Sequence, residues 1–196
     1  MEKYNSVHRH FVLYKPYGYL SQFYSNSSQQ KKKKFLGLLY DFPNDSMAIG
    51  RLDEKSEGLL LITTDGKTSD FVNSKKVDKE YYVQVNGDIT NQAIQNLKVG
   101  VEIGFEGKKY ITKPCTVSKL NAVPGFPNRS KKIRDDRHGP TSWISITLNE
   151  GKFRQVRKMT SAVGYATLRL VRVRIGHIRL ESMCSGDVVE VENLEF

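Results

Sequence analysis

Apolar and polar positions along the chain repeat with two spacings, every second residue in some segments and every third or fourth in others. The clearest alternation covers residues 79–85, where Tyr81, Val83 and Val85 share one face of a predicted strand with a single buried side. Residues 59–62 are apolar throughout, which is typical of a central strand. Strands are predicted over residues 10–15, 47–52, 58–63, 79–85, 109–120, 143–148, 167–178 and 188–191.

Helical spacing and turn residues predict the connections between these strands. Thr90 is a suitable N-cap and Gly100 a suitable end for a helix over residues 91–98, and Asp65 with Gly66 predicts a turn. We find no internal repeat, so the order of elements predicts an α+β fold with a mixed, mostly antiparallel central sheet flanked by helices and loops. Further helices are predicted over residues 35–40, 68–74 and 152–163, and loops over residues 25–34 and 121–141.

The length of 196 residues suits a single domain, with two lobes that share one sheet and span roughly 1–65 and 66–196. No apolar run approaches the ~18–20 residues of a membrane span, and the N-terminal residues lack the apolar segment of a secretory signal. Cys115 and Cys184 stand alone, which argues against structural zinc and redox motifs. Two buried thiols in a reducing cytosol are the simpler interpretation, and a disulfide between them is the alternative.

The net charge of the chain indicates what kind of partner it binds. The chain carries +10 at pH 7 with a pI of about 9.5, and such a field attracts polyanions and speeds their encounter. Nucleic acid is the leading partner, and the alternative is a basic surface that serves only solubility. An anionic membrane surface is a weaker third candidate, because no basic amphipathic helix ends the chain.

The first candidate for chemistry is a carboxylate between two predicted strands. Gly50-Arg51-Leu52-Asp53 ends one strand and Gly58 begins the next, so Asp53 lies on a short loop that two rigid elements hold. Such a position suits a carboxylate that reacts with a bound substrate. A turn aspartate or a helix cap is the ordinary alternative.

The second candidate lies in the predicted helix over residues 152–163. Its apolar residues share one face, Arg154 and Lys158 share the opposite face, and Arg157 falls at the border between them. A border arginine can lay its stem on the core and present its planar fork to a carboxylate. The more common explanation of this pattern is a basic helix face in solvent.

The third candidate is Tyr81, within the segment Lys79-Glu80-Tyr81-Tyr82-Val83. Its ring can stack on a nucleobase while its hydroxyl reaches the base or the ribose. A core tyrosine with a satisfied hydroxyl is the alternative, and the residue taken alone favours that alternative.

Together the three segments resemble the motifs of one family, the RsuA branch of the pseudouridine synthases. The resemblance extends from about residue 14 to residue 191 and is closest to the subgroup E of enzymes that act on large-subunit (23S) rRNA. Phe153, where many relatives carry Asn, and the lysine run 31–34 depart from the pattern. The matching segments are Gly50-Arg51-Leu52-Asp53 with residues 56–61, residues 79–83, and residues 151–160 with 167–172.

The resemblance implies the pseudouridine synthase fold with an active-site cleft. It implies a single catalytic domain over residues 1–196 without an N-terminal S4 RNA-binding module, because residues 11–18 already match the start of the catalytic domain. The implied activity is isomerisation of one ribosomal uridine to pseudouridine. This reaction breaks the N1–C1′ glycosidic bond, turns the uracil and rejoins it through C5, so neither a cofactor nor a metal is expected.

The resemblance also implies roles for individual residues. Asp53 acts as nucleophile or base, Arg157 pairs with it, and Tyr81 stacks on the uracil. Arg51 fills the gap that the flipped nucleotide leaves. The residues expected to hold RNA are Arg51, Lys79, Arg154, Lys158, Lys31, Lys32, Lys33, Lys34, Arg129, Lys131, Lys132, Arg134 and Arg137. A slip in the apolar phase leaves open the faces of three further arginines, Arg169, Arg172 and Arg174.

Two other functions explain part of the pattern. A non-catalytic rRNA-binding assembly factor accounts for the charge but gives no reason for a carboxylate together with Tyr81 and Arg157. A base-releasing glycosidase also places a carboxylate beside a glycosidic bond. A zinc deaminase is excluded, because the chain has no His-x-Glu followed by Pro-Cys-x-x-Cys. We expect a cytoplasmic monomer that binds large-subunit ribosomal RNA and no membrane.

Overall fold

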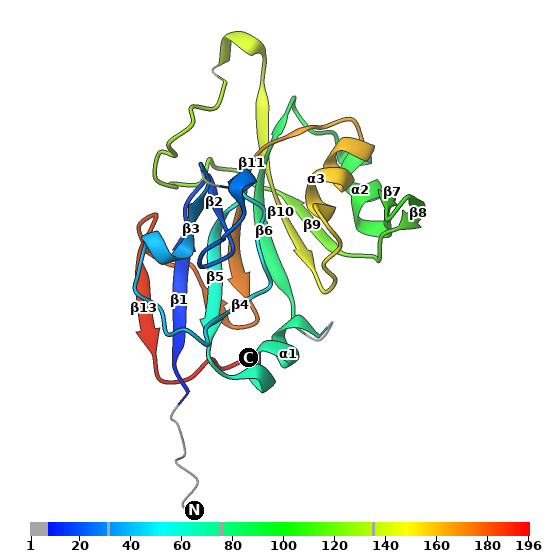
Figure 1. The fold of residues 1–196 in the computed structure, drawn as a ribbon. Coiled ribbons are helices and arrows are strands. Elements are labelled where there is room, and N and C mark those ends of the chain that lie inside the picture. The colour runs from blue at the N-terminus through cyan, green and yellow to red at the C-terminus, as the bar shows by residue number, and fades with distance from the viewer. Residues whose placement is uncertain (1–7, 31, 75–76, 135) are drawn as a thin grey trace, which may run out of the picture.

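A single large sheet forms the centre of the computed structural model, which describes residues 8–30, 32–74, 77–134 and 136–196 (Figure 1). Within these residues the sheet contains nine strands, which are β1 (His10–Lys15), β4 (Met47–Ile49), β5 (Glu57–Thr63), β6 (Lys79–Asn86), β9 (Thr116–Lys119), β10 (Thr141–Leu148), β11 (Thr167–Ile175), β12 (Ile178–Arg179) and β13 (Val188–Val191). Seven of them follow the order β13-β1-β5-β11-β6-β10-β9, while β4 pairs with β5 and β12 pairs with β11.

The strands of this sheet pair antiparallel except for β5 and β11, which run parallel at its centre. The prediction of a mixed, mostly antiparallel sheet is therefore confirmed. The last strand, β13, pairs with the first, β1, so the two ends of the strand order in the chain are neighbours in the sheet. The division into lobes at 1–65 and 66–196 stays a prediction.

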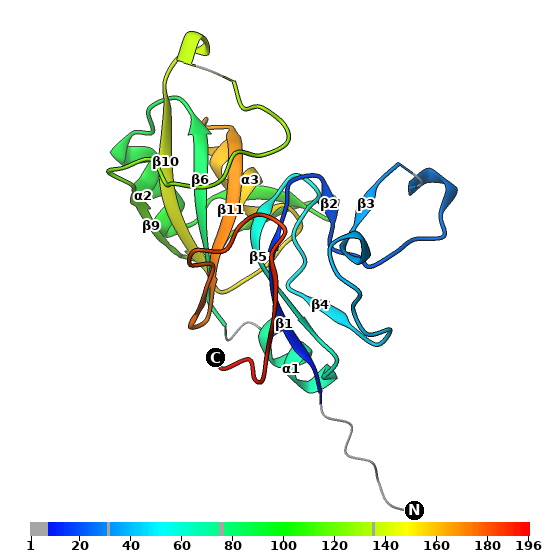
Figure 2. The same ribbon diagram turned by 90° about the vertical axis from the view of Figure 1, so that its left-hand side faces the viewer.

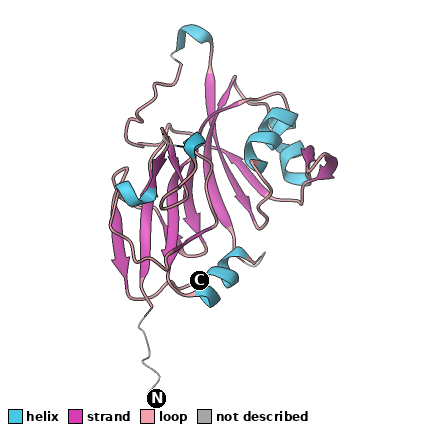
Figure 3. Ribbon diagram, in the orientation of Figure 1, coloured by secondary structure: helices cyan, strands magenta, loops and turns pink. Residues whose placement is uncertain are grey.

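Helices pack against one face and at one end of this sheet (Figure 3). α2 (Asn91–Val99) and α3 (Gln155–Ala162) share an apolar cluster with β6 and β10, and α1 (Gly66–Asn73) contacts β4 and β5. The smaller elements are the paired strands β2 (Tyr19–Leu20) and β3 (Lys34–Phe35), the hairpin β7 (Glu102–Phe105) and β8 (Lys108–Ile111), and the single-turn helices η1 (Ser28–Gln30), η2 (Leu36–Leu38) and η3 (Asp136–His138).

Strand β5 contributes to the core on both of its faces. Leu59 and Leu61 pack in a cluster with Val72 of α1, whereas Leu60 and Ile62 pack in a second cluster with the residues around η2. All four β5 side chains are fully buried. Burial on both faces explains why residues 59–62 are apolar without alternation.

Among the predicted elements that differ from the structure, two do so for identifiable physical reasons. Asp65 makes no turn with Gly66 but caps α1, because its carboxylate accepts hydrogen bonds from the backbone N–H groups of Lys67 and Thr68. The single strand predicted over residues 109–120 is two strands, since β8 folds back on β7 in a hairpin before β9 begins on the large sheet.

Strand β11 contains two irregularities in its register with β6, one of them between Arg172 and Arg174. An extra residue in one strand changes the face on which the following side chains lie. Arg172 consequently lies opposite Tyr81, whereas Arg174 lies opposite Glu80 on the other face and pairs with it, Nε to Oε2 at 2.9 Å. Because of this irregularity, the residues of β11 do not alternate regularly between the two faces of the sheet, and for this reason the sequence pattern did not decide on which face each β11 arginine lies.

The parallel contact between β5 and β11 depends on Gly58. Its φ of 102° lies in the left-handed region, and a Cβ added there would lie 2.3 Å from the carbonyl oxygen of Arg172. No side chain can be placed at this position without moving one strand away from the other. Gly58 therefore sets the separation between the two central strands.

We predict that Gly58→Ala lowers the free energy of unfolding by about 2–4 kcal/mol, because the methyl group overlaps backbone atoms in an unfavourable conformation. Urea denaturation measures this change. Gly66→Ala is the matched control, since an added Cβ there has no heavy atom within 4 Å. The control should leave stability unchanged or raise it by about 0.4–1 kcal/mol. Wild-type stability in the Gly58 variant would contradict this account of the junction.

Candidate active site

Asp53 lies on the loop between β4 and β5, and hydrogen bonds fix the backbone on both sides of it. Before it, the Oγ of Ser21 accepts from the Leu52 N–H at 3.0 Å and donates to the Leu52 carbonyl at 2.8 Å. After it, the Ser56 N–H donates to the Asp53 carbonyl at 3.0 Å. The carboxylate keeps 19% of its exposure, so it is sheltered but reachable.

Two arginines at the start of α3 face this carboxylate. Arg154 is the N-cap residue, with a φ of 54°, and its Nη1 lies 3.5 Å from Oδ2 of Asp53. Arg157 places its Nε 3.9 Å from the same oxygen. The helix begins at Gln155 rather than at residue 152, so Arg154 precedes it and turns toward Asp53 instead of lying on a solvent face.

Arg157 is also anchored to the loop that carries Asp53. Its Nη2 donates to the Lys55 carbonyl at 2.7 Å and to the Ser56 Oγ at 3.3 Å. Burial lowers the pKa of Arg157 and the charge of Arg154 lowers it further, while Asp53 favours the charged form. The guanidinium therefore links α3 to the loop between β4 and β5.

A cavity of about 860 Å³ opens beside Asp53. Its lining includes Asp53, Arg154 and Tyr81, together with Gly50 and Arg51 of the loop. The volume lies within the range of roughly 300–1,000 Å³ that is usual for ligand sites. Tyr81 is half-buried and packs on the apolar cluster of α2 and α3. The structure thus brings the carboxylate and the phenol to one cavity.

Three cations are buried close to this cavity. Lys15, Lys79 and Arg172 are almost entirely buried, and the last two belong to the lining. The Nζ of Lys15 donates to the Pro16 carbonyl at 2.9 Å. Burial lowers the pKa of Lys15 to about 7 and that of Lys79 to about 8.

These groups limit the chemistry that the site can perform. A carboxylate between two guanidinium groups can attack a carbon atom or accept a proton, and a phenol beside it can stack on a ring or exchange a proton. Across the described ranges, no three His, Cys, Asp or Glu side chains gather so as to hold a metal ion. The same residues contain no helix with the length and apolarity to cross a membrane.

Three residues expected to hold RNA line the cavity, and a fourth, Lys158, lies one helical turn after Arg154. Arg51 is exposed and, like Arg154, lines the cavity. Lys158 is half-buried and donates to the Gly104 carbonyl at 2.7 Å. Lys79 is buried under the cavity instead of lying on the open surface.

Lys32 and Lys33 lie on the segment that joins β2 to β3, and Lys34 begins β3; this part of the chain projects to one side of the sheet (Figure 2). Lys32, Lys33 and Lys34 are exposed. Lys33 pairs with Glu54, next to Asp53, at 2.8 Å, and Lys34 lies over the Tyr19 ring at 5.5 Å. Lys31 lies outside the described residues.

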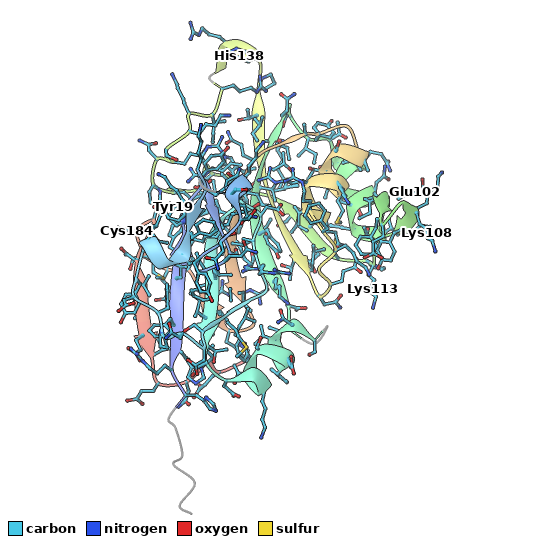
Figure 4. All side chains as sticks on the ribbon, viewed as in Figure 1. Tyr19, Glu102, Lys108, Lys113, His138 and Cys184 are labelled. Carbon is cyan, nitrogen blue, oxygen red and sulfur yellow. The ribbon has the colours of Figure 1, made fainter. Side chains whose placement is uncertain are left out.

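The remaining candidates lie on residues 121–140, the segment whose outer end carries the labelled His138 (Figure 4). Phe126 fixes the start of this segment, with ring centroids 5.8 Å from Trp143 and 6.0 Å from Tyr82. Arg129 lies over the Tyr17 ring at 4.6 Å. Arg129 and Arg134 are half-buried. The exposed residues of this segment include Lys131, Lys132 and Arg137.

Sequence reasoning missed two contributors to the site and left the position of a third open. Ser21 holds the loop through its hydrogen bonds to Leu52, and a lone serine between predicted elements carries no signal for this contact. Lys15 ends an apolar strand just before a proline, and a charged residue in such a strand is a sequence signal for a buried cation. Arg172 was noted, yet its burial depends on the irregular register of β11.

Comparison with known proteins gives one consistent result. The family model described as RNA pseudouridylate synthase matches residues 9–162. A ribosomal large subunit pseudouridine synthase E from Xanthomonas axonopodis pv. citri (strain 306) is 41% identical over 174 residues, 88% of this chain and 88% of the relative. A ribosomal large subunit pseudouridine synthase B from Bacillus subtilis (strain 168) is 29% identical, over 93% of this chain and 67% of the relative.

Solved structures show the same similarity in three dimensions. A crystal structure of a pseudouridylate synthase superposes with a TM-score of 0.72 at 26% identity, covering 94% of this chain and 70% of that one. Human RNA Pseudouridylate Synthase Domain Containing 1 superposes with a TM-score of 0.52 at 16% identity, over 95% of this chain and 80% of that one, which shows a shared fold alone. The fold expected from the three motifs is thereby confirmed.

We predict that the free energy of unfolding rises with pH between about 7 and 10.5, because the unfolded state still binds the proton that folded Lys15 has released. The slope for one group reaches at most about 1.4 kcal/mol per pH unit. Lys15→Met should reduce this rise to the part that Lys79 contributes and should raise stability at pH 7, as urea denaturation at pH 7 and 9 would show. Lys67→Met, at an exposed position of α1, is the control. An unchanged slope in the Lys15 variant would refute the assignment.

Proposed function

The chain belongs to the RNA pseudouridylate synthase family and to its RsuA branch, and on this premise we propose that it converts one uridine of large-subunit ribosomal RNA to pseudouridine with Asp53 as the reacting carboxylate. Membership makes it an isomerase that acts on RNA. The printed names of the relatives, synthases E and B of the ribosomal large subunit, support that RNA as the substrate.

One observation carries the proposal. The Asp53 carboxylate lies within 3.5 Å of Arg154 and 3.9 Å of Arg157 and lines the same cavity as Tyr81. An aspartate in an ordinary turn does not require two neighbouring arginines, and an aspartate that caps a helix would accept hydrogen bonds from backbone N–H groups instead. A carboxylate oriented by two cations at the wall of a cavity is the arrangement that acid, base or nucleophilic chemistry requires.

The proposed reaction assigns a task to each of these groups. Asp53 acts as nucleophile or base while the N1–C1′ bond breaks and the uracil turns. Arg157 and Arg154 hold the carboxylate in position through charge. Tyr81 stacks on the uracil and exchanges a proton with it or with the ribose. The uracil then rejoins the ribose through C5, so the RNA chain stays intact.

The target uridine must leave its stack to reach this cavity. Structured RNA hides the glycosidic bond, and extruding one nucleotide costs a few kcal/mol. Arg51, at the cavity and exposed, fills the gap that is left. The lysine run 31–34 and the basic residues of the segment 121–140 bind phosphates on either side.

The setting of this reaction follows from its substrate. We place the protein in the cytoplasm, where ribosomal RNA is assembled, and we propose that it acts as a monomer. Asp53, Tyr81 and Arg154 of one chain line one cavity, and Arg157 of the same chain contacts Asp53, so the proposed reaction needs no residue from a second copy.

We predict that Asp53→Asn abolishes pseudouridine formation on a large-subunit rRNA transcript, by at least about 10³-fold, because the amide can neither attack nor take a proton. Thermal unfolding and RNA binding should stay near wild type. Asp45→Asn, at an exposed position outside the cavity lining, is the matched control and should retain full activity. Full activity in the Asp53 variant would remove this carboxylate from the mechanism.

We predict that replacing residues 31–34 by alanine weakens RNA binding and flattens its salt dependence, by up to roughly 0.9 in log–log slope for each lost phosphate contact. Filter binding across salt concentrations measures both quantities. Lys108→Ala with Lys109→Ala, on the hairpin that lies far from Tyr19 (Figure 4), controls for the loss of positive charge alone. A salt slope equal to that of the wild type would show that the lysine run does not bind RNA.

A further inference from the structure

Arg172 is a buried cation of the cavity lining to which the proposed reaction assigns no task. It is 1% exposed, lies opposite Tyr81 in the pairing of β11 with β6, and has its guanidinium 6.0 Å from the centre of the Tyr81 ring. Its Nε donates to the Leu59 carbonyl at 2.7 Å, whereas its Nη2 is buried without a hydrogen-bond partner among the described residues. A charged group with an unused donor therefore borders the cavity.

Lys79 adds a second cation beside Arg172. Its Nζ donates to the carbonyls of Val72 and Val77 at 3.2 and 3.1 Å. Gly50 lies next to both cations. A Cβ added to Gly50 would lie 3.4 Å from Nη1 of Arg172 and 3.4 Å from Cε of Lys79. Because Gly50 has no side chain, the cavity extends down to these two residues.

Within the described residues, neither Arg172 nor Lys79 forms an ion pair with a carboxylate. Arg169, on the same strand, donates from Nε and Nη2 to the two carboxylate oxygens of Glu57 at 3.1 and 2.8 Å. In the part of the chain that the structure describes, Arg172 and Lys79 instead donate to backbone carbonyls and form no ion pair. Buried cations without counter-charges are unfavourable, and negative charge that forms in the cavity compensates them.

We propose that Arg172, assisted by Lys79, stabilises the negative charge that the uracil acquires when its glycosidic bond breaks, an inference that rests on the proposed function. When the N1–C1′ bond breaks, its electron pair stays on N1, and the anion is shared with the oxygens O2 and O4. C5 of the anion then bonds to C1′, the proton on C5 leaves, and N1 gains a proton. The product is an isomer, with no net change in protons or electrons.

The position of the two cations suits this task. Burial lowers the pKa of Arg172, while the neighbouring Tyr81 side chain favours its charged form. An arginine keeps its charge even when buried, so the field acts on the uracil that Tyr81 contacts in the proposed reaction. Charges fixed in a low-dielectric site before the reaction act strongly on charge that develops during it.

The test compares RNA carrying uridine at the target position with RNA carrying 5-fluorouridine there. Fluorine makes the departing anion more stable, so bond cleavage then needs less help from the protein. Single-turnover loss of the target nucleoside, followed by mass spectrometry of nuclease digests, reports cleavage for both substrates. We expect Arg172→Met to slow uridine cleavage about 10²-fold and 5-fluorouridine cleavage at least tenfold less, with RNA affinity unchanged and partial rescue in Arg172→Lys.

Two further variants keep the test decisive. Lys79→Met should also slow uridine cleavage more than 5-fluorouridine cleavage, but to a smaller degree than Arg172→Met. If Arg172→Met does not fold, Lys79→Met and Arg172→Lys replace it in the comparison. Arg174→Met removes a neighbouring arginine that pairs with Glu80 on the other face, so it should affect both substrates equally. Equal losses for both substrates in the Arg172 and Lys79 variants would overturn this inference alone. A wild-type protein that converts neither substrate would overturn the proposed function.

Discussion

The contact of the Asp53 carboxylate with Arg154 and Arg157 depends on the parallel pairing of β5 with β11. α3 precedes β11 by a short connection and contacts it, and Gln155 and Val156 at the start of the helix line the same cavity as Leu170 and Arg172 of the strand. There Val171 pairs with Glu57, four residues after Asp53. Arg157 completes the link by donating to the Lys55 carbonyl. The close strand separation set by a glycine in β5 is thus what brings segments about a hundred residues apart into one site.

A second constraint concerns the charges of the site. Positive charge is buried around the cavity lined by Asp53, the carboxylate that we propose to react. Arg169 shows that this chain can pair a buried arginine fully with a glutamate where no reaction is proposed. Arg172, Lys79 and Lys15 are held by backbone carbonyls instead. Such groups reduce the stability of the fold, and active sites commonly retain them because the reaction needs their field. Burial away from water also lowers the pKa values of Lys15 and Lys79, which shows that the charged forms of both lysines are unfavourable in the fold.

Local signals in the sequence were sufficient for much of the fold. The strand over residues 10–15 and the helix between Thr90 and Gly100 were predicted correctly, because alternation and capping are properties of neighbouring residues. Motifs singled out Asp53, Tyr81 and Arg157 as candidates, and their catalytic roles stay predictions; the structure places Arg157 3.9 Å from Asp53 and Tyr81 in the lining of the same cavity as Asp53. Contacts between distant segments were not predictable, since the left-handed start of α3 and the irregular register of β11 are set by tertiary packing. Those two features decide where Arg154 and Arg172 lie.

Incubation of the purified protein with an unmodified large-subunit rRNA transcript, followed by mapping of pseudouridine at single-nucleotide resolution, tests the central claim most directly. The account predicts that one uridine becomes pseudouridine without added metal or cofactor and without release of free uracil. RNA that is bound but left unmodified would contradict it and favour a role in ribosome assembly, and free uracil would contradict it in favour of a glycosidase.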